Sequence, residues 1–126
     1  MTMRDDKPTI LVVDDDIDVL ETETIMLDEF GYNTIPCTRA DEALDIVASG
    51  MPLDMVLTDV IMVGSIDGWH LAERIRAVRP HLKIAFTSGY LMPSTVDKVI
   101  ARGELFLPKP WRAVTLMNFV RGALAS

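Results

Sequence analysis

The fold is decided by the stretch Thr9-Ile10-Leu11-Val12-Val13-Asp14-Asp15-Asp16, close to the start of the chain. Its first five residues are apolar or β-branched, and three aspartates end the run abruptly. A short, continuous run of this kind is typical of a strand that is buried on both faces of a parallel sheet. We therefore expect a buried strand at Thr9–Val13 whose carboxyl end carries a cluster of acids.

Strands and helices alternate along the rest of the sequence. Over Asp18–Phe30 the spacing becomes helical, with Leu20, Thr24 and Leu27 on about one face. The expected strands are Thr9–Val13, Tyr32–Cys37, Met55–Thr58, Lys83–Thr87 and Glu104–Leu107. The other expected helices are one opened by a capping box of Thr38 and Asp41, one that ends before Pro80, one over Ser94–Arg102, and one after Pro110. Strict alternation predicts an α/β fold, a five-stranded parallel sheet with helices on both faces.

Length and composition bound the class of protein. The chain has 126 residues, 49% hydrophobic and 25% charged, which suits one globular domain at 9–126 after a loose leader at 1–8. The net charge of −7 argues against a nucleic-acid-binding surface, which needs a basic patch. No apolar run approaches the roughly 20 residues of a membrane span. Cys37 is the single cysteine, so no internal disulfide forms, and we expect a cytoplasmic protein.

Polar residues gather at the carboxyl ends of the expected strands. Asp14 and Asp15 follow the first strand, Asp59 the third, Thr87 the fourth and Lys109 the fifth. Ligand sites of open α/β sheets form outside these ends, so we expect the side chains to meet in one cleft. Packed carboxylates repel each other and need a cation, and an all-oxygen cluster of this kind suits Mg²⁺.

Four segments together resemble the receiver domain of response regulators in two-component signalling. They are Val12-Val13-Asp14-Asp15-Asp16, Leu57-Thr58-Asp59-Val60-Ile61-Met62, Phe86-Thr87-Ser88-Gly89-Tyr90 and Phe106-Leu107-Pro108-Lys109-Pro110. Their order and spacing fit the family over essentially the whole chain. The resemblance implies a doubly wound, flavodoxin-like three-layer sandwich.

The resemblance also implies a chemistry for the acidic cluster. Asp59 would be the phosphoacceptor, taking a phosphoryl group from a phosphohistidine of a histidine kinase or a histidine phosphotransfer protein. Asp15 and Asp59 would ligate Mg²⁺ with the backbone carbonyl of Ile61, and Asp14 would act mainly through bound water. The domain would catalyse only its own phosphorylation and dephosphorylation.

The remaining family positions imply a switch. Lys109, before a cis bond to Pro110, would neutralise charge on the phosphoryl oxygens. Thr87 would turn its hydroxyl to a phosphoryl oxygen, and Phe106 would then rotate inward and change the surface that a downstream protein target reads. With no second domain in the 126 residues, we expect the signal to leave through protein contacts made by a monomer or weak dimer.

Three departures from the family pattern stand near Asp59. Val63 replaces a common proline, and the following Gly64-Ser65-Ile66-Asp67-Gly68 is one residue longer than the commonest loop, as in receivers of hybrid histidine kinases. A receiver from a hybrid kinase is thus an alternative to a stand-alone regulator. Ile61 is apolar where polar residues often position the hydrolytic water, so we hypothesise that it slows phosphoryl loss.

Other interpretations of the same residues remain open. The aspartate triplet is also consistent with a solvated loop in which Asp16 caps a helix. Asp14 and Asp16 superficially fit a phosphatase with an aspartyl nucleophile, although such folds need a longer chain. A flavin-binding electron carrier of the same architecture would need a phosphate loop where the aspartates stand, and these would repel the anion. We interpret His70 and His81 as surface residues, and Trp69 and Trp111 as packing at helix starts.

Overall fold

A computed structural model describes residues 7–62, 66–89, 97 and 101–125. Its elements in chain order are β1 (Thr9–Val13), α1 (Ile17–Glu29), β2 (Asn33–Cys37), α2 (Ala40–Ala48), β3 (Met55–Asp59), α3 (Gly68–Val78), β4 (Lys83–Ser88), β5 (Leu105–Pro108) and α5 (Ala113–Ala125). The predicted strands all form, with ends that differ by one residue at most. Of the helix expected over 94–102 the structure describes residues 97, 101 and 102, which are helical; the rest of that helix, residues 63–65 and most of the leader lie outside the described residues.

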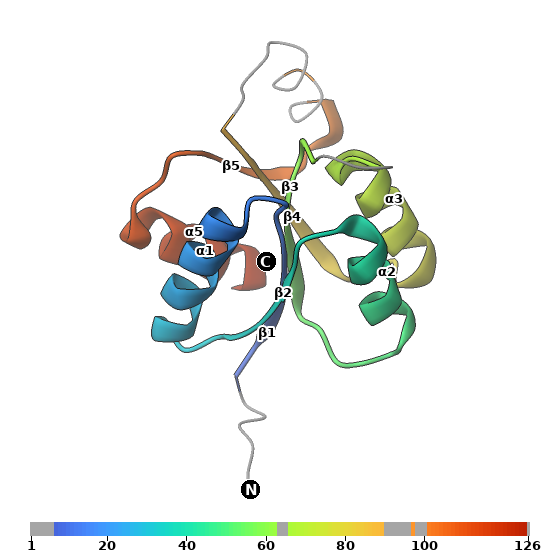
Figure 1. Cartoon of the computed structure of the whole chain (residues 1–126), viewed down its shortest axis with the longest axis horizontal. Helices are drawn as coiled ribbons and strands as arrows, with labels where there is room; N and C mark the ends of the chain where they lie inside the picture. The colour runs from blue at the N-terminus through green and yellow to red at the C-terminus, as the bar shows by residue number, and fades with distance from the viewer. Residues whose placement is uncertain (1–6, 63–65, 90–96, 98–100, 126) are drawn as a thin grey trace, which may run out of the picture.

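The strands form one parallel sheet in the order β2-β1-β3-β4-β5. In Figure 1 the sheet is seen nearly edge-on, with α1 and α5 on one face and α2 and α3 on the other. After β1 the chain adds β2 at one edge of the sheet, and then crosses back to place β3, β4 and β5 on the other side of β1. The order of strands therefore reverses beside β1. This confirms the predicted three-layer α/β fold, and the strand order places its switch point between β1 and β3.

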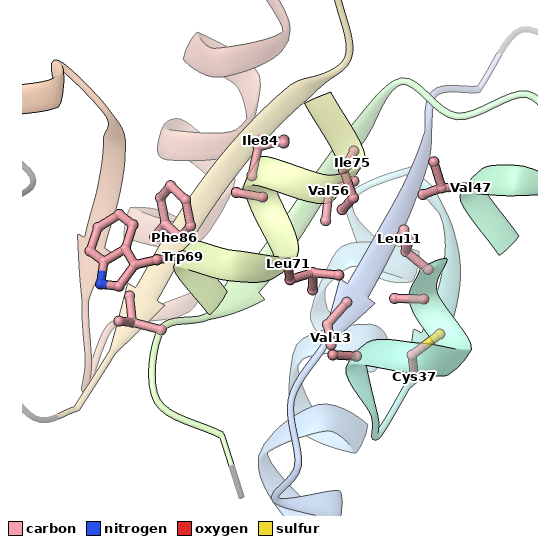
Figure 2. Packing of buried hydrophobic residues seen from close by; sticks show 14 residues of the cluster. Leu11, Val13, Cys37, Val47, Val56, Trp69, Leu71, Ile75, Ile84 and Phe86 are labelled. Carbon is pink, nitrogen blue, oxygen red and sulfur yellow. The ribbon is translucent and has the colours of Figure 1, made fainter. Parts of the chain in front are cut away.

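The face under α2 and α3 has an apolar core. The first cluster of buried side chains includes Leu11 and Val13 from β1, Val56 from β3, and Ile84 and Phe86 from β4 (Figure 2). The Trp69 ring tilts against Phe86 with 4.4 Å between ring centroids, so this face is packed tightly as far as the start of α3.

The opposite face holds a second cluster, beneath α1 and α5. It takes the alternate residues of the same strands, among them Ile10, Val12, Met55, Leu57, Ala85 and Leu107. Because successive side chains of a strand point to opposite faces, continuing each series by two residues leads to Asp14, Asp59, Thr87 and Lys109. The strand pattern that buries the second cluster therefore directs the predicted site residues to the α1–α5 face.

The helix starts were only partly predicted. Asp16 is the N-cap of α1, and its carboxylate accepts hydrogen bonds from the backbone N–H groups of Asp18 and Val19. The capping box of Thr38 and Asp41 was wrong: α2 has Arg39 as its N-cap, without a side-chain capping bond. The Asp41 carboxylate instead forms an ion pair with the Arg39 guanidinium at 2.7 Å and therefore does not act in a capping box.

Candidate functional site

Three carboxylates meet at the carboxyl ends of β1 and β3. One oxygen from each of Asp14, Asp15 and Asp59 lies within 4.8 Å of the others. Asp14 is completely buried, whereas the side chain of Asp59 is 13% exposed and reachable from solvent. The donor set is all oxygen, and three carboxylates carry more negative charge than the Lys109 ammonium offsets, so these residues fit a hard divalent cation such as Mg²⁺.

Lys109 reaches this cluster from the turn after β5. Its Nζ donates to Asp14 Oδ2 at 2.8 Å and to Asp59 Oδ2 at 3.3 Å. The Lys109 backbone N–H donates to the Ser88 carbonyl at 2.9 Å, which ties the turn to β4, and the Lys109–Pro110 bond is cis as predicted. Burial alone would lower the pKa of Lys109, but the hydrogen bond to Asp14 and the charge of Asp59 raise it overall, so the ammonium stays charged.

Asp59 is held in an electrostatically unfavourable position. Burial raises its pKa and the charge of Asp14 raises it further, while Lys109 and the Ile61 N–H act in the opposite direction. The Ile61 N–H donates to Asp59 Oδ1 at 3.3 Å, and the Ile61 side chain beside it is 48% exposed. A carboxylate that burial disfavours and one ammonium stabilises is suited to accept an electrophile.

The backbone around Asp59 is fixed by a close approach of α3. Val60 donates its N–H to the Thr87 carbonyl at 3.0 Å, and Gly68 donates to the Val60 carbonyl at 2.7 Å. A Cβ atom on Gly68 would collide with the carbonyl oxygen of Asp59 and lie 2.9 Å from the Val60 Cα. The sequence alone indicates only a loop residue at Gly68, because this requirement comes from a contact between separate segments.

Thr87 and Phe106 lie on neighbouring strands but on different faces. Thr87 pairs with Asp59 in the sheet register, and its Oγ1 accepts a hydrogen bond from the Trp111 indole N–H at 3.3 Å. Phe106 pairs with Phe86 and is half-buried against the first cluster. The structure thus brings Thr87 to the acidic cluster and leaves Phe106 on the opposite side of the sheet.

Glu23 is a buried acid that the sequence analysis missed. The helical pattern had assigned Leu20, Thr24 and Leu27 to the inner face of α1, but the residues buried there are Leu20, Glu23 and Leu27. Glu23 is 1% exposed, and within the described part of the chain its Oε1 has no hydrogen-bond partner. Burial, the largest cause, together with the charge of Asp14, raises its pKa to about 8, with Lys109 opposing.

The other sequence predictions fall outside the cluster. His70 and His81 are exposed, as expected, and Cys37 is buried, with desolvation raising the pKa of its thiol to about 12. Among the helices of the described ranges, none has the length and apolar character needed to cross a membrane.

Comparison with known proteins gives a consistent result. The family model described as the response regulator receiver domain matches residues 10–121. The "DNA-binding transcriptional regulator NtrC" of Azospirillum brasilense is 34% identical over 94% of this chain and 24% of its own length. The "Response regulator MprA" of Mycolicibacterium vanbaalenii is 34% identical over 91% of this chain and 49% of its own length. The chain therefore spans a quarter to a half of these two relatives.

Solved structures show the same likeness. A response regulator receiver protein from Sinorhizobium medicae superposes with a TM-score of 0.85, at 25% identity and 98% coverage of each chain. The receiver domain from the hybrid histidine kinase CckA has a TM-score of 0.76 at 32% identity, over 92% of this chain and 98% of its own.

Proposed function

The chain belongs to the response regulator receiver domain family, and on that basis we propose that Asp59 is its phosphoacceptor. The observation that supports this most directly is the Lys109 ammonium, which contacts Asp14 and Asp59 together. Of the two carboxylates that Lys109 contacts, Asp59 is the more exposed: its side chain is 13% exposed, against 1% for that of Asp14. Asp59 is therefore the one of these two carboxylates that an incoming phosphoryl group can reach.

The proposed reaction is a transfer from nitrogen to oxygen. One Asp59 carboxylate oxygen attacks the phosphorus of a phosphohistidine, the new O–P bond forms as the P–N bond breaks, and the imidazole leaves and regains its proton from solvent. The Lys109 ammonium neutralises charge on the phosphoryl oxygens, which is the main task in phosphoryl transfer. Asp15, Asp59 and the Ile61 carbonyl would hold Mg²⁺, with Asp14 acting through water; the bound ion would supply further positive charge beside those oxygens.

The switch that would follow begins at Thr87. We propose that its hydroxyl donates to a phosphoryl oxygen on Asp59, its neighbour in the sheet register. Phe106 would then rotate inward and alter the surface around β5. Phe106 is only half-buried where it packs against the first cluster, so an inward rotation would bury more of its ring.

Receiver domains act between kinases and downstream effectors, and we propose the same for this chain. A histidine kinase or phosphotransfer protein would donate, and a protein target would read the result. The likeness to the CckA receiver supports a place in or beside a hybrid kinase as the alternative to a separate regulator. The Azospirillum relative is described as a DNA-binding regulator, but this chain matches only 24% of its length. We therefore do not propose DNA binding for this chain.

Ile61 is proposed to set the lifetime of the phosphoryl group. Its side chain is 48% exposed although it is apolar, and its backbone contacts Asp59 Oδ1, so it is placed to cover the acyl phosphate from water. Replacing it by asparagine in Ile61→Asn should speed phosphoryl loss severalfold. Timing the loss of label from both proteins tests this, and equal lifetimes would reject it.

Phosphorylation with a small donor tests the whole proposal. Wild-type protein incubated with acetyl phosphate and Mg²⁺ should gain one phosphoryl group by mass, and Asp59→Asn should gain none. Asp45→Asn, an exposed aspartate of α2, is the matched control and should label as the wild type does. Labelling of Asp59→Asn would contradict the assignment, and many turnovers of a phosphate ester would favour a phosphatase.

A further inference from the structure

The Thr87 hydroxyl has a partner that the proposed switch does not use. The Trp111 indole N–H donates to Thr87 Oγ1 at 3.3 Å, and Thr87 itself is 1% exposed. Trp111 lies two residues beyond Lys109, so the same short turn after β5 contacts both the acceptor carboxylate and the switch hydroxyl. The contact links Thr87 to the start of α5.

The strand alternation favours Trp111 over Phe106 as the neighbour that controls Thr87. Thr87 continues the series of Ala85 on the α1–α5 face, and Trp111 packs against the second cluster on that face. Phe106 packs against the first cluster, on the other side of the sheet. We propose that Trp111 is the positioning residue for Thr87, holding its oxygen in place for an incoming phosphoryl group.

The chemistry of the two groups allows both contacts at once. A threonine hydroxyl has one hydrogen and two lone pairs, and an indole N–H is a donor only. Trp111 therefore occupies a lone pair of Oγ1 and leaves the hydroxyl hydrogen for a phosphoryl oxygen on Asp59. Donation by the indole also polarises the O–H bond, which strengthens the hydrogen bond that the hydroxyl donates in turn.

The turn that carries Trp111 is itself anchored. The Lys109 N–H is bound to the Ser88 carbonyl at 2.9 Å, and the indole ring lines a pocket with Val19 and Pro110. A rotation of the indole ring would move its N–H relative to the Thr87 hydroxyl, while the bond to Ser88 would hold the Lys109 backbone in position. Trp111 thus acts on the hydroxyl separately from the charge pair.

Nuclear magnetic resonance of the indole N–H groups tests the contact directly. The chain has two tryptophans, and Trp69, packed on Phe86 in the first cluster, is the internal reference. Thr87→Val removes the hydroxyl at nearly constant shape, so the Trp111 resonance should shift while that of Trp69 stays. Thr87→Ser keeps the hydroxyl and should retain the wild-type Trp111 resonance. A Trp111 resonance that is indifferent to Thr87→Val overturns the inference.

Binding of beryllofluoride with Mg²⁺, a phosphoryl mimic, tests the positioning role, which rests on the proposed function. Trp111→Phe keeps an aromatic ring without the N–H and should weaken binding about two- to tenfold, the range of one net hydrogen bond. In the Thr87→Val background the same change should have no further effect.

The outcomes separate the two proposals. If Trp111→Phe weakens beryllofluoride binding equally in the wild-type and Thr87→Val proteins, or in neither of them, the role of Trp111 is overturned and Asp59 remains the proposed acceptor. Failure of the wild type to bind beryllofluoride would instead reject the acceptor, and the positioning role with it.

Discussion

The two faces of the sheet bury different kinds of side chain. Under α2 and α3 the first cluster is apolar, and the buried polar strand residues that alternate onto that face, Thr58 and Ser88, carry only hydroxyl groups. Among the described residues Asp14, Glu23 and Asp59 bury their carboxyl groups on the α1–α5 face, whereas Glu104, whose side chain is 8% exposed, is paired with Arg76 of α3 at 2.8 Å. The α2–α3 face stabilises the fold mainly by apolar burial, and the α1–α5 face adds to its own apolar cluster acidic groups whose charged forms burial disfavours.

The largest expected effect concerns the apolar face. Phe86 is fully buried and its ring packs on Trp69, so Phe86→Ala should lower the free energy of unfolding by about 3–5 kcal/mol. Urea unfolding measures the loss. The control Val114→Ala, at a residue 51% exposed, should stay within about 0.5 kcal/mol. A loss at Phe86 as small as that at Val114 would contradict the division between the faces.

The next effect concerns Glu23 and depends on pH. Burial raises its pKa to about 8 in the fold from 4.5, so as pH rises from 4.5 toward 8 the unfolded chain loses this proton and the folded chain keeps it. Stability therefore falls over that window. Glu23→Gln removes the titration, so its stability relative to wild type should rise by on the order of 3 kcal/mol between pH 5 and pH 8.

Denaturant unfolding of both proteins at each pH measures this difference. Glu21→Gln, on the exposed side of the same helix, is the matched control and should follow the wild type at every pH. A constant difference between Glu23→Gln and wild type would show that the buried carboxyl does not hold a proton.

Glu23 also marks the limit of what the sequence predicts. Asp14, Asp59, Thr87 and Lys109 were predictable because apolar runs locate strand ends, and parallel strands bring those ends together. A glutamate within a helical pattern is ordinarily a surface residue, and only the approach of α1 to the sheet buries it. Contacts between distant segments, such as Trp111 on Thr87, leave no local pattern in the sequence.

Gly68 joins the two faces, since it lies at the start of α3 and touches the backbone of Asp59. The Cβ of Gly68→Ala would collide with the Asp59 carbonyl, so we expect a loss of about 1–3 kcal/mol and slower labelling of Asp59 by acetyl phosphate. Gly122→Ala is the control, because a Cβ at this helical glycine meets nothing within 4 Å. It should be neutral or slightly stabilising. Normal labelling of Gly68→Ala would show that the Asp59 loop tolerates displacement.

The smallest effect should have the opposite sign. Burial raises the pKa of Asp59, so its charged form is disfavoured in the fold, and Asp59→Asn should stabilise the protein at pH 7 while abolishing phosphorylation. We expect a gain of no more than about 1 kcal/mol, because the lost contact with Lys109 offsets part of it.

The gain should shrink as pH falls toward the pKa of an ordinary aspartate, where the wild-type carboxyl becomes neutral too. Urea unfolding at pH 7 and pH 4 measures it, with Asp45→Asn as the unaffected control. A loss of stability at pH 7 would mean that the pair with Lys109 outweighs burial. The charged Asp59 carboxylate would then not lower the stability of the fold. That result would contradict a site in which an unfavourable environment keeps the acceptor reactive.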